Sequence, residues 1–364
     1  MRRDLLSCYP TGLLEFHPTD VCDLDCVECH YRAKGDDTFP FKEVASGVQR
    51  LPPRAITIRG GGEPNLYFSG GQDFFQLLLS IKGALPGVHL GLINNNTYLP
   101  PGAWPKLLAW QRSSIDAATP DTYVALKRRP LFETAVKNVQ RFLCETAIPH
   151  VGVGFLFRRE SAHELFLFLN NWFDWISGEA ASLQRRFNIQ FRSISPGIEE
   201  LAELRASGKP YPDRATLETL SEHTARVRRR MYVDPPFAAF IAQHTNFESS
   251  FASCDSSLFL HSPKSFEHCY NALCLRVLRA TGEEYPDFLL CNDPELSLGN
   301  ALRAPDENGA LRVALMQYFY FNRSGPFCCP EECRQGWVSN TIERLRAKGQ
   351  AVREGAEDPI AYFF

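Results

Sequence analysis

The first two hundred residues alternate short apolar runs with longer amphipathic stretches, and this alternation constrains the fold more than any other feature. Short runs rich in Val, Ile and Phe that end in Gly, Asn, Pro or Asp are typical of buried strands. Helical periodicity is clearest in three of the intervening stretches, residues 74–85, 132–144 and 164–176. Six strands are predicted, over residues 13–16, 55–58, 88–93, 114–117, 151–157 and 187–192.

Strands that alternate with helices pair as a parallel sheet with right-handed crossovers. Because six strands are too few for a closed eight-stranded barrel, the sequence predicts an α/β fold with a partial (β/α)6 barrel over residues 1–200. Functional groups in such folds lie on the loops after the carboxyl ends of the strands.

The rest of the chain differs in composition from the predicted barrel. Residues 201–250, with a charged helix over 213–231, are expected to form a helical bridge. Residues 251–340 are expected to form a smaller Cys-rich domain with a hairpin over 275–290, and residues 341–364 a C-terminal helix and tail.

The overall composition excludes several classes of protein. Charged residues make up 22% of the chain and the formal net charge is −3, which argues against disorder and against general attraction to nucleic acid or an anionic membrane. The N-terminus lacks a secretory apolar segment, and no apolar run approaches the roughly 18 residues of a spanning helix. We therefore expect a soluble cytoplasmic protein with no nucleic-acid or membrane partner.

The chain contains 12 cysteines, and a reducing compartment makes metal binding more plausible for them than disulfides. Cys22, Cys26 and Cys29 follow the first predicted strand with C-x3-C-x2-C spacing. Three thiolates in so short a loop can hold a [4Fe–4S] cluster and leave one iron open to another ligand. The alternative is a zinc site completed by His30 or by a distant ligand.

With this loop, the sequence resembles the radical SAM superfamily, whose members carry C-x3-C-x2-C after the first strand of a partial β/α barrel. One β/α unit later, Gly61, Gly62, Glu63 and Pro64 resemble the family's Gly-Gly-Glu-Pro element, which binds the amino group of S-adenosylmethionine (SAM). Taken alone, this segment would be a tight turn between a strand and a helix.

The resemblance extends to the ends of three more strands. Asn95, in a run of asparagines, resembles the family's polar turn, although such a run is also a plain turn signal. Ser114 and Asp116 resemble the ribose element, and strand alternation would place both on one face, toward the ribose or carboxylate of SAM. Arg192 is a candidate to pair with the SAM carboxylate, with a surface role as the alternative.

One position departs from the family pattern. Many members carry an aromatic residue just before the third cysteine, where this sequence has Glu28. Tyr31, two residues past Cys29, is the candidate to pack beside the adenine instead.

A second group of cysteines lies near the C-terminus and resembles a SPASM or shorter twitch extension, which carries auxiliary clusters in some radical SAM enzymes. The resemblance implies an auxiliary [4Fe–4S] cluster, with a structural zinc or unliganded core cysteines as the alternatives. Its expected ligands are Cys274, Cys291, Cys329 and Cys333. The roles of Cys254, Cys269 and Cys328 stay open, whereas the isolated Cys8 and Cys144 are expected to be structural.

The resemblance also implies a reaction. The cluster would receive an electron from a flavodoxin- or ferredoxin-type donor and cleave SAM to a 5′-deoxyadenosyl radical, which abstracts hydrogen from the substrate. The auxiliary cluster would aid oxidation or bind the substrate. No residue is identified as a catalytic acid or base.

The substrate is the least determined part of this prediction. Only 21 residues precede Cys22, too few for a leader-binding domain, so a small molecule of sugar, cyclitol or nucleoside type in natural-product biosynthesis is expected. Peptide or protein modification is one alternative, and a non-catalytic zinc-binding module is another.

Overall fold

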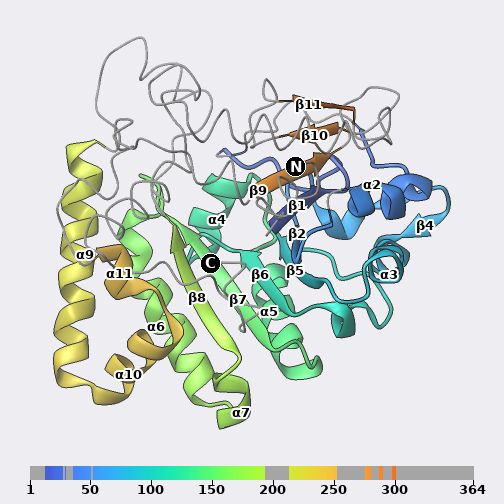
Figure 1. The fold of residues 1–364 in the computed structure, drawn as a ribbon. Coiled ribbons are helices and arrows are strands. Elements are labelled where there is room, and N and C mark those ends of the chain that lie inside the picture. The colour runs from blue at the N-terminus through green and yellow to red at the C-terminus, as the bar shows by residue number, and fades with distance from the viewer. Residues whose placement is uncertain are drawn as a thin grey trace, which may run out of the picture.

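A nine-stranded sheet forms the centre of the protein (Figure 1). The computed structural model describes residues 13–27, 29, 36–50, 52–192, 213–251, 275–279, 287–289 and 297–300. Six adjacent strands are parallel and follow chain order, which confirms the predicted α/β fold with a six-strand parallel sheet. They are β1 (Leu13–His17), β2 (Ala55–Ile58), β5 (His89–Asn94), β6 (Trp110–Ser114), β7 (His150–Leu156) and β8 (Phe187–Arg192).

The crossovers between these strands are mostly helical, and the three amphipathic stretches form helices as predicted. The exception is the crossover from β5 to β6, which contains only the short η3 (Trp104–Leu107). The other crossover elements are η1 (Phe41–Glu43), α2 (Val44–Arg50), η2 (Pro64–Leu66), β3 (Phe68–Ser69), β4 (Gln72–Asp73), α3 (Phe74–Ala84), α4 (Pro120–Lys127), α5 (Phe132–Glu145), η4 (Ala162–Glu164), α6 (Leu165–Ser177) and α7 (Ala181–Gln184).

The two faces of the sheet differ in chemistry. Successive strand residues point to opposite faces, so Leu14 and Phe16 of β1 join the apolar core beneath the helices, whereas Glu15 and His17 lie on the other face. Cross-strand register extends this second face, which we call the polar face. Its polar residues are Glu15, His17, Thr57, Arg59, His89, Arg112, Ser114, His150, Asn188, Gln190 and Arg192.

The predicted fourth strand, over residues 114–117, is wrong, because β6 runs from Trp110 to Ser114. Polar residues within β6 interrupt the apolar pattern that is typical of a buried strand. Gln111 is fully buried on the helix-facing side, where its amide donates to Asn94 Oδ1 at 2.8 Å and to Ser113 Oγ at 2.7 Å. These hydrogen bonds satisfy the buried amide nitrogen of Gln111. Because a polar residue is buried in this way, hydrophobic periodicity alone does not find β6.

Helices also cover the outer edge of β8. The predicted helix over 213–231 is present as α9 (Arg214–Val233), which runs beside α6 in Figure 1 and is followed by α10 (Pro235–His244) and α11 (Phe247–Phe251). Asn246 pairs with the backbone of Phe191 in both directions, at 2.7 and 3.0 Å. This contact occupies backbone groups that an edge strand would otherwise expose. No helix among the described residues is long and apolar enough to cross a membrane.

Three strands from the C-terminal third extend the opposite edge of the sheet. β9 (Leu275–Arg279) pairs parallel with β1, and β10 (Asp287–Leu289) pairs antiparallel with β9, as the hairpin predicted over 275–290 requires. β11 (Ser297–Asn300) pairs antiparallel with β10. The predicted domain bounds stay predictions, and the C-terminal helix and tail lie outside the described residues.

A buried carboxylate fixes the segment that follows β6. Glu164, at the start of α6, accepts hydrogen bonds from the backbone N–H of Ala118 at 2.6 Å and from the hydroxyl groups of Thr119 and Thr122. Thr119 also caps the first turn of α4. One side chain therefore sets the path of the chain between the end of β6 and α4.

We expect Glu164→Ala to lower the free energy of unfolding by about 3 kcal/mol, because three donors in a mostly buried environment lose a charged acceptor. Urea denaturation would measure the loss. Glu145→Ala is the matched control, since Glu145 pairs with Arg141 on the exposed side of α5 and should cost less than about 1 kcal/mol. Equal losses in the two variants would contradict this role of Glu164.

Candidate functional site

The loop with the first three cysteines follows β1 and is fixed to the end of α4. Cys22, Cys26 and Cys29 are all half-buried. The backbone N–H groups of Asp25 and Val27 donate to the carbonyl groups at the end of α4, at 3.2 Å to Lys127 and 2.9 Å to Leu126. These bonds hold the middle of the loop in place.

The type and number of donors suit an iron–sulfur cluster with one open iron. In the stretches that the structure describes, no three His, Cys, Asp or Glu side chains are grouped closely enough to hold a metal ion. The loop therefore brings the three sulfurs into one short segment without fixing them as a preformed ligand set. Such coupling of ligand order to metal binding is common, because metal sites are seldom complete in the metal-free chain.

The glycines after β2 allow the next loop to pack directly on the cysteine loop. The backbone N–H of Gly62 donates to Thr19 O at 2.7 Å. A Cβ on Gly62 would lie 2.0 Å from Val21 O, and a Cβ on Gly61, whose φ is +70°, would lie 2.2 Å from Asp20 Oδ1. These positions therefore require glycine for contact between the two loops, whatever ligand they also bind.

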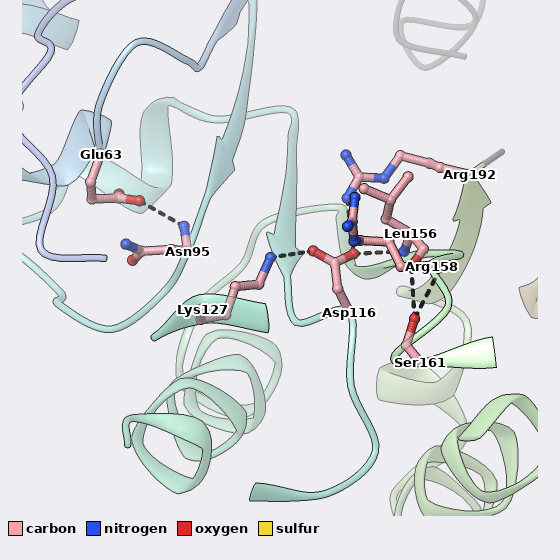
Figure 2. Close-up of polar contacts among 8 residues, drawn as sticks. All are labelled: Glu63, Asn95, Asp116, Lys127, Leu156, Arg158, Ser161 and Arg192. Atoms are coloured by element: carbon pink, nitrogen blue, oxygen red, sulfur yellow. Dashed lines mark hydrogen bonds and ion pairs between the residues drawn. The ribbon is translucent and has the colours of Figure 1, made fainter. Parts of the chain in front are cut away.

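Glu63 ties the same loop to the end of β5. Its buried carboxylate accepts from the backbone N–H of Asn95 at 2.7 Å (Figure 2) and from the backbone N–H of Asn65 at 3.1 Å. Burial raises the pKa of Glu63 to about 8, although both hydrogen bonds act to lower it. The adjacent Pro64 is buried at the start of η2.

Asn95 reaches from β5 back to the cysteine loop. Its side-chain amide donates to Asp23 Oδ1 at 2.6 Å, and the hydroxyl of Thr97 donates to Asp23 Oδ2. Asp23 stands between two of the cysteines, so this contact orients the loop. Sequence reasoning did not single out Asp23 or Thr97, because no local pattern signals a contact between residues more than seventy positions apart.

Asp116 lies at the centre of a buried ion-pair cluster (Figure 2). Lys127 Nζ donates to Oδ2 at 2.6 Å, while Arg192 Nη2 and the backbone N–H of Leu156 donate to Oδ1 at 3.0 and 2.7 Å. Burial acts to raise the pKa of Asp116, but the charges of Lys127 and Arg192 outweigh it and hold that pKa below its ordinary value. Lys127 is the residue of this cluster that sequence reasoning missed.

The expectation that Ser114 and Asp116 share one face of a strand is wrong. Ser114 is the last residue of β6, and Asp116 adopts a left-handed conformation with φ of +60° beyond the end of the strand. That turn directs the carboxylate toward Lys127 and Arg192 instead of continuing the pleat. Asp is among the few residues other than glycine that tolerate such a conformation.

Several predicted site residues remain without structural test. The ion pair with Asp116 occupies one nitrogen of Arg192, and the predicted contact of Arg192 with the SAM carboxylate stays a prediction. Cys144 is exposed on α5, contrary to the expectation that it is a buried structural residue. The remaining predicted positions lie outside the described residues: Tyr31, Cys274, Cys291, Cys329 and Cys333.

Comparison with solved structures connects this fold to a known enzyme. The radical SAM enzyme anSMEcpe has been solved with bound AdoMet, and also with AdoMet and the Cp18Cys peptide. Both structures match with 13% identity and a TM-score of 0.54, over 93% of this chain and 97% or 98% of theirs. At this identity, the likeness shows that the fold is shared.

A third match is weaker. BtrN in complex with AdoMet and 2-DOIA matches 85% of this chain and 87% of its own, with 8% identity and a TM-score of 0.39. That score is too low to establish a common fold. No protein-family model matches the sequence, and no curated protein matches it.

The buried Glu63 predicts a pH-dependent stability. Its folded-state pKa of about 8 lies above the ordinary 4.5, so its contribution is fully present at low pH and is lost as the pH rises through about 8. Between about pH 5 and 8, the wild-type protein should lose up to about 1.4 kcal/mol per pH unit relative to Glu63→Gln. Denaturant unfolding of both proteins at several pH values tests this.

The control for that experiment is Glu145→Gln, which alters an exposed carboxylate in a surface ion pair. Its unfolding free energy should follow that of the wild type across the same range. Parallel curves for the wild type and Glu63→Gln would show that Glu63 keeps an ordinary pKa.

Proposed function

We propose that this protein is a radical SAM enzyme that acts on a small-molecule substrate. The observation that carries the proposal is the attachment of the three-cysteine loop to both the Gly61–Glu63 turn and the end of α4. This arrangement lies on a six-strand parallel sheet whose fold is shared with anSMEcpe. A structure of that enzyme contains AdoMet.

Cys22, Cys26 and Cys29 would hold the cluster. When bound, a [4Fe–4S] cluster with an open iron supplies the electron for reductive cleavage of SAM. The protein holds the loop through Gly62, and it orients Asp23 through Asn95. We propose a flavodoxin- or ferredoxin-type protein as the electron donor.

The Asp116 cluster would hold the residues next to the cysteine loop in position. Lys127 binds Asp116 with its ammonium group and accepts from the Asp25 N–H with its carbonyl oxygen, so one residue joins the cluster to the cysteine loop. The buried ion pair keeps this junction ordered and limits the access of water. Exclusion of water protects a reactive radical from side reactions.

The polar face of the sheet favours a compact and polar substrate. Glu15, His17 and Arg112 are each less than one-tenth exposed, and they project from strands on the face opposite the apolar core. Buried polar groups of this kind bind a ligand by a few well-placed hydrogen bonds. We therefore retain the sugar, cyclitol or nucleoside class as the proposed substrate.

Peptide modification is the second candidate. It is favoured by one observation, namely that a structure of the fold relative anSMEcpe contains the Cp18Cys peptide.

An auxiliary [4Fe–4S] cluster on Cys274, Cys291, Cys329 and Cys333 is part of both proposals and would aid oxidation or bind the substrate.

Cys26→Ala should abolish formation of 5′-deoxyadenosine from SAM and dithionite, because two remaining thiols cannot hold the cluster with its open iron. The measurement uses protein purified without oxygen and reconstituted with iron and sulfide, with metal and sulfide counted. Cys144→Ala is the matched control, since this exposed thiol on α5 should be dispensable. Retained turnover in Cys26→Ala, or uptake of zinc with refusal of iron and sulfide by the wild type, would refute the proposal and favour a zinc module.

The substrate class is tested by deuterium transfer. Candidate sugars, cyclitols and nucleosides with deuterium at each carbon are incubated with the reconstituted enzyme, and 5′-deoxyadenosine is analysed by mass spectrometry. Transfer from one of these molecules is expected. Transfer only from labelled peptides would reject the small-molecule proposal and support the second candidate.

A further inference from the structure

The polar face carries an arginine that forms no ion pair with an acidic side chain among the described residues. Arg112 stands in the middle of β6 between Ile93 of β5 and Gly152 of β7 in cross-strand register. Only 6% of its surface is exposed. No hydrogen bond from its guanidinium to a described residue is formed, and its buried Nε has no acceptor. Its guanidinium carbon lies 5.3 Å from the ring centroid of Trp110.

A second arginine converges on the same place. A Cβ on Gly154 of β7 would lie 3.4 Å from Arg192 Nη2 and 3.7 Å from Arg112 Cδ. Gly154 therefore lies between two arginine side chains, one from β6 and one from β8, and both come close to its Cα.

Two carboxylates whose charges act on Arg112, those of Glu15 and Asp116, also pair with other cations. Glu15 pairs with Arg59 at 3.1 Å, and Asp116 pairs with Lys127 at 2.6 Å and with Arg192 at 3.0 Å.

The surroundings of Arg112 also disfavour its positive charge. Burial, followed by repulsion from Arg192 and Arg59, holds the pKa of Arg112 well below its ordinary value, although Asp116 and Glu15 act in the other direction. An arginine nonetheless stays protonated in proteins. A buried cation without an acceptor is costly to the folded protein, and an anionic ligand that reaches it would remove that cost.

We propose that Arg112 binds a carboxylate or phosphate group of the small-molecule substrate, with Arg192 beside it. This proposal rests on the proposed function and narrows the substrate to an anionic sugar, cyclitol or nucleoside derivative. The planar guanidinium donates two parallel hydrogen bonds to such groups.

The position of Arg112 favours the substrate over SAM as the source of the anion. Arg112 lies inside β6, opposite Ile93 of β5 and Gly152 of β7, whereas the cysteine loop follows β1 and is bonded to the end of α4. The amino and carboxylate groups of SAM would have to reach the open iron, which that loop would hold. The group bound by Arg112 therefore belongs to a molecule on the polar face.

The test measures binding of two probes, inorganic phosphate and acetate, to the reconstituted wild-type enzyme by equilibrium dialysis with radiolabelled ions. We expect one saturable site per chain. Tighter binding of phosphate would indicate a phosphorylated substrate, and tighter binding of acetate would indicate a carboxylate. Failure of both ions to saturate would overturn the proposal.

Substitutions then assign the site. Arg112→Gln should weaken binding of the preferred ion by about 10- to 100-fold, as expected for loss of a charge-assisted hydrogen-bond pair. Arg141→Gln is the matched control, because Arg141 is exposed on α5 and should leave affinity unchanged. SAM affinity should change less than about twofold in Arg112→Gln. An equal loss for SAM would assign Arg112 to the SAM carboxylate and overturn the proposal.

Thermal unfolding separates binding from folding. Arg112→Gln should melt at the wild-type temperature or higher, because it removes a buried charge that lacks an acceptor. If this variant does not fold, the proposal is tested on the wild-type protein alone. Phosphate or acetate should then raise the melting temperature of the wild type above its value in sodium chloride of equal ionic strength. No rise would overturn the proposal.

The two proposals fail in different ways. Saturable anion binding without formation of 5′-deoxyadenosine would refute the proposed radical chemistry and leave the anion site intact. Formation of 5′-deoxyadenosine without anion binding would refute the anion site and leave the proposed radical chemistry intact.

Discussion

The contact between the turn after β2 and the loop after β1 is the constraint on which the rest of the site depends. Gly62 and Glu63 donate backbone hydrogen bonds to Thr19 and Val21 at 2.7 and 2.8 Å. The two loops meet so closely that a single methyl group on Gly62 would overlap the backbone of Val21. The loop of three cysteines thereby gains a support on one side, and the entropy of ordering it for metal binding is reduced.

The other side of the loop is held by charge. Lys127 accepts a backbone hydrogen bond from Asp25 and pairs with Asp116, which in turn pairs with Arg192 at the end of β8. A buried ion pair is not in itself a strong source of stability. Its effect here is geometric, because it connects the cysteine loop, the end of β6 and the end of β8 through two adjacent carboxylate oxygens.

The same sheet therefore serves two purposes on its two faces. Residues such as Phe16 and Leu92 bury apolar surface against the helices, and this burial supplies the main driving force for folding. The polar face holds Glu15, His17 and Arg112 away from water. Burial of charged groups at such positions is typical of a binding site, where local rules of stability are broken for function.

The sequence by itself determined the class of fold and the location of the candidate site, since strand and helix periodicity and cysteine spacing are local properties. The extent of β6 could not be predicted from the sequence, because Gln111 and Ser113 are polar residues within the strand. Gln111 is buried there with hydrogen bonds to Ser113 and to Asn94 of the neighbouring strand. The partners of Asp23, Asp116 and Arg112 were likewise decided only by the tertiary structure. Such contacts between residues tens of positions apart produce no periodic pattern in the sequence. They form when parallel strands bring their carboxyl ends to one edge of the sheet.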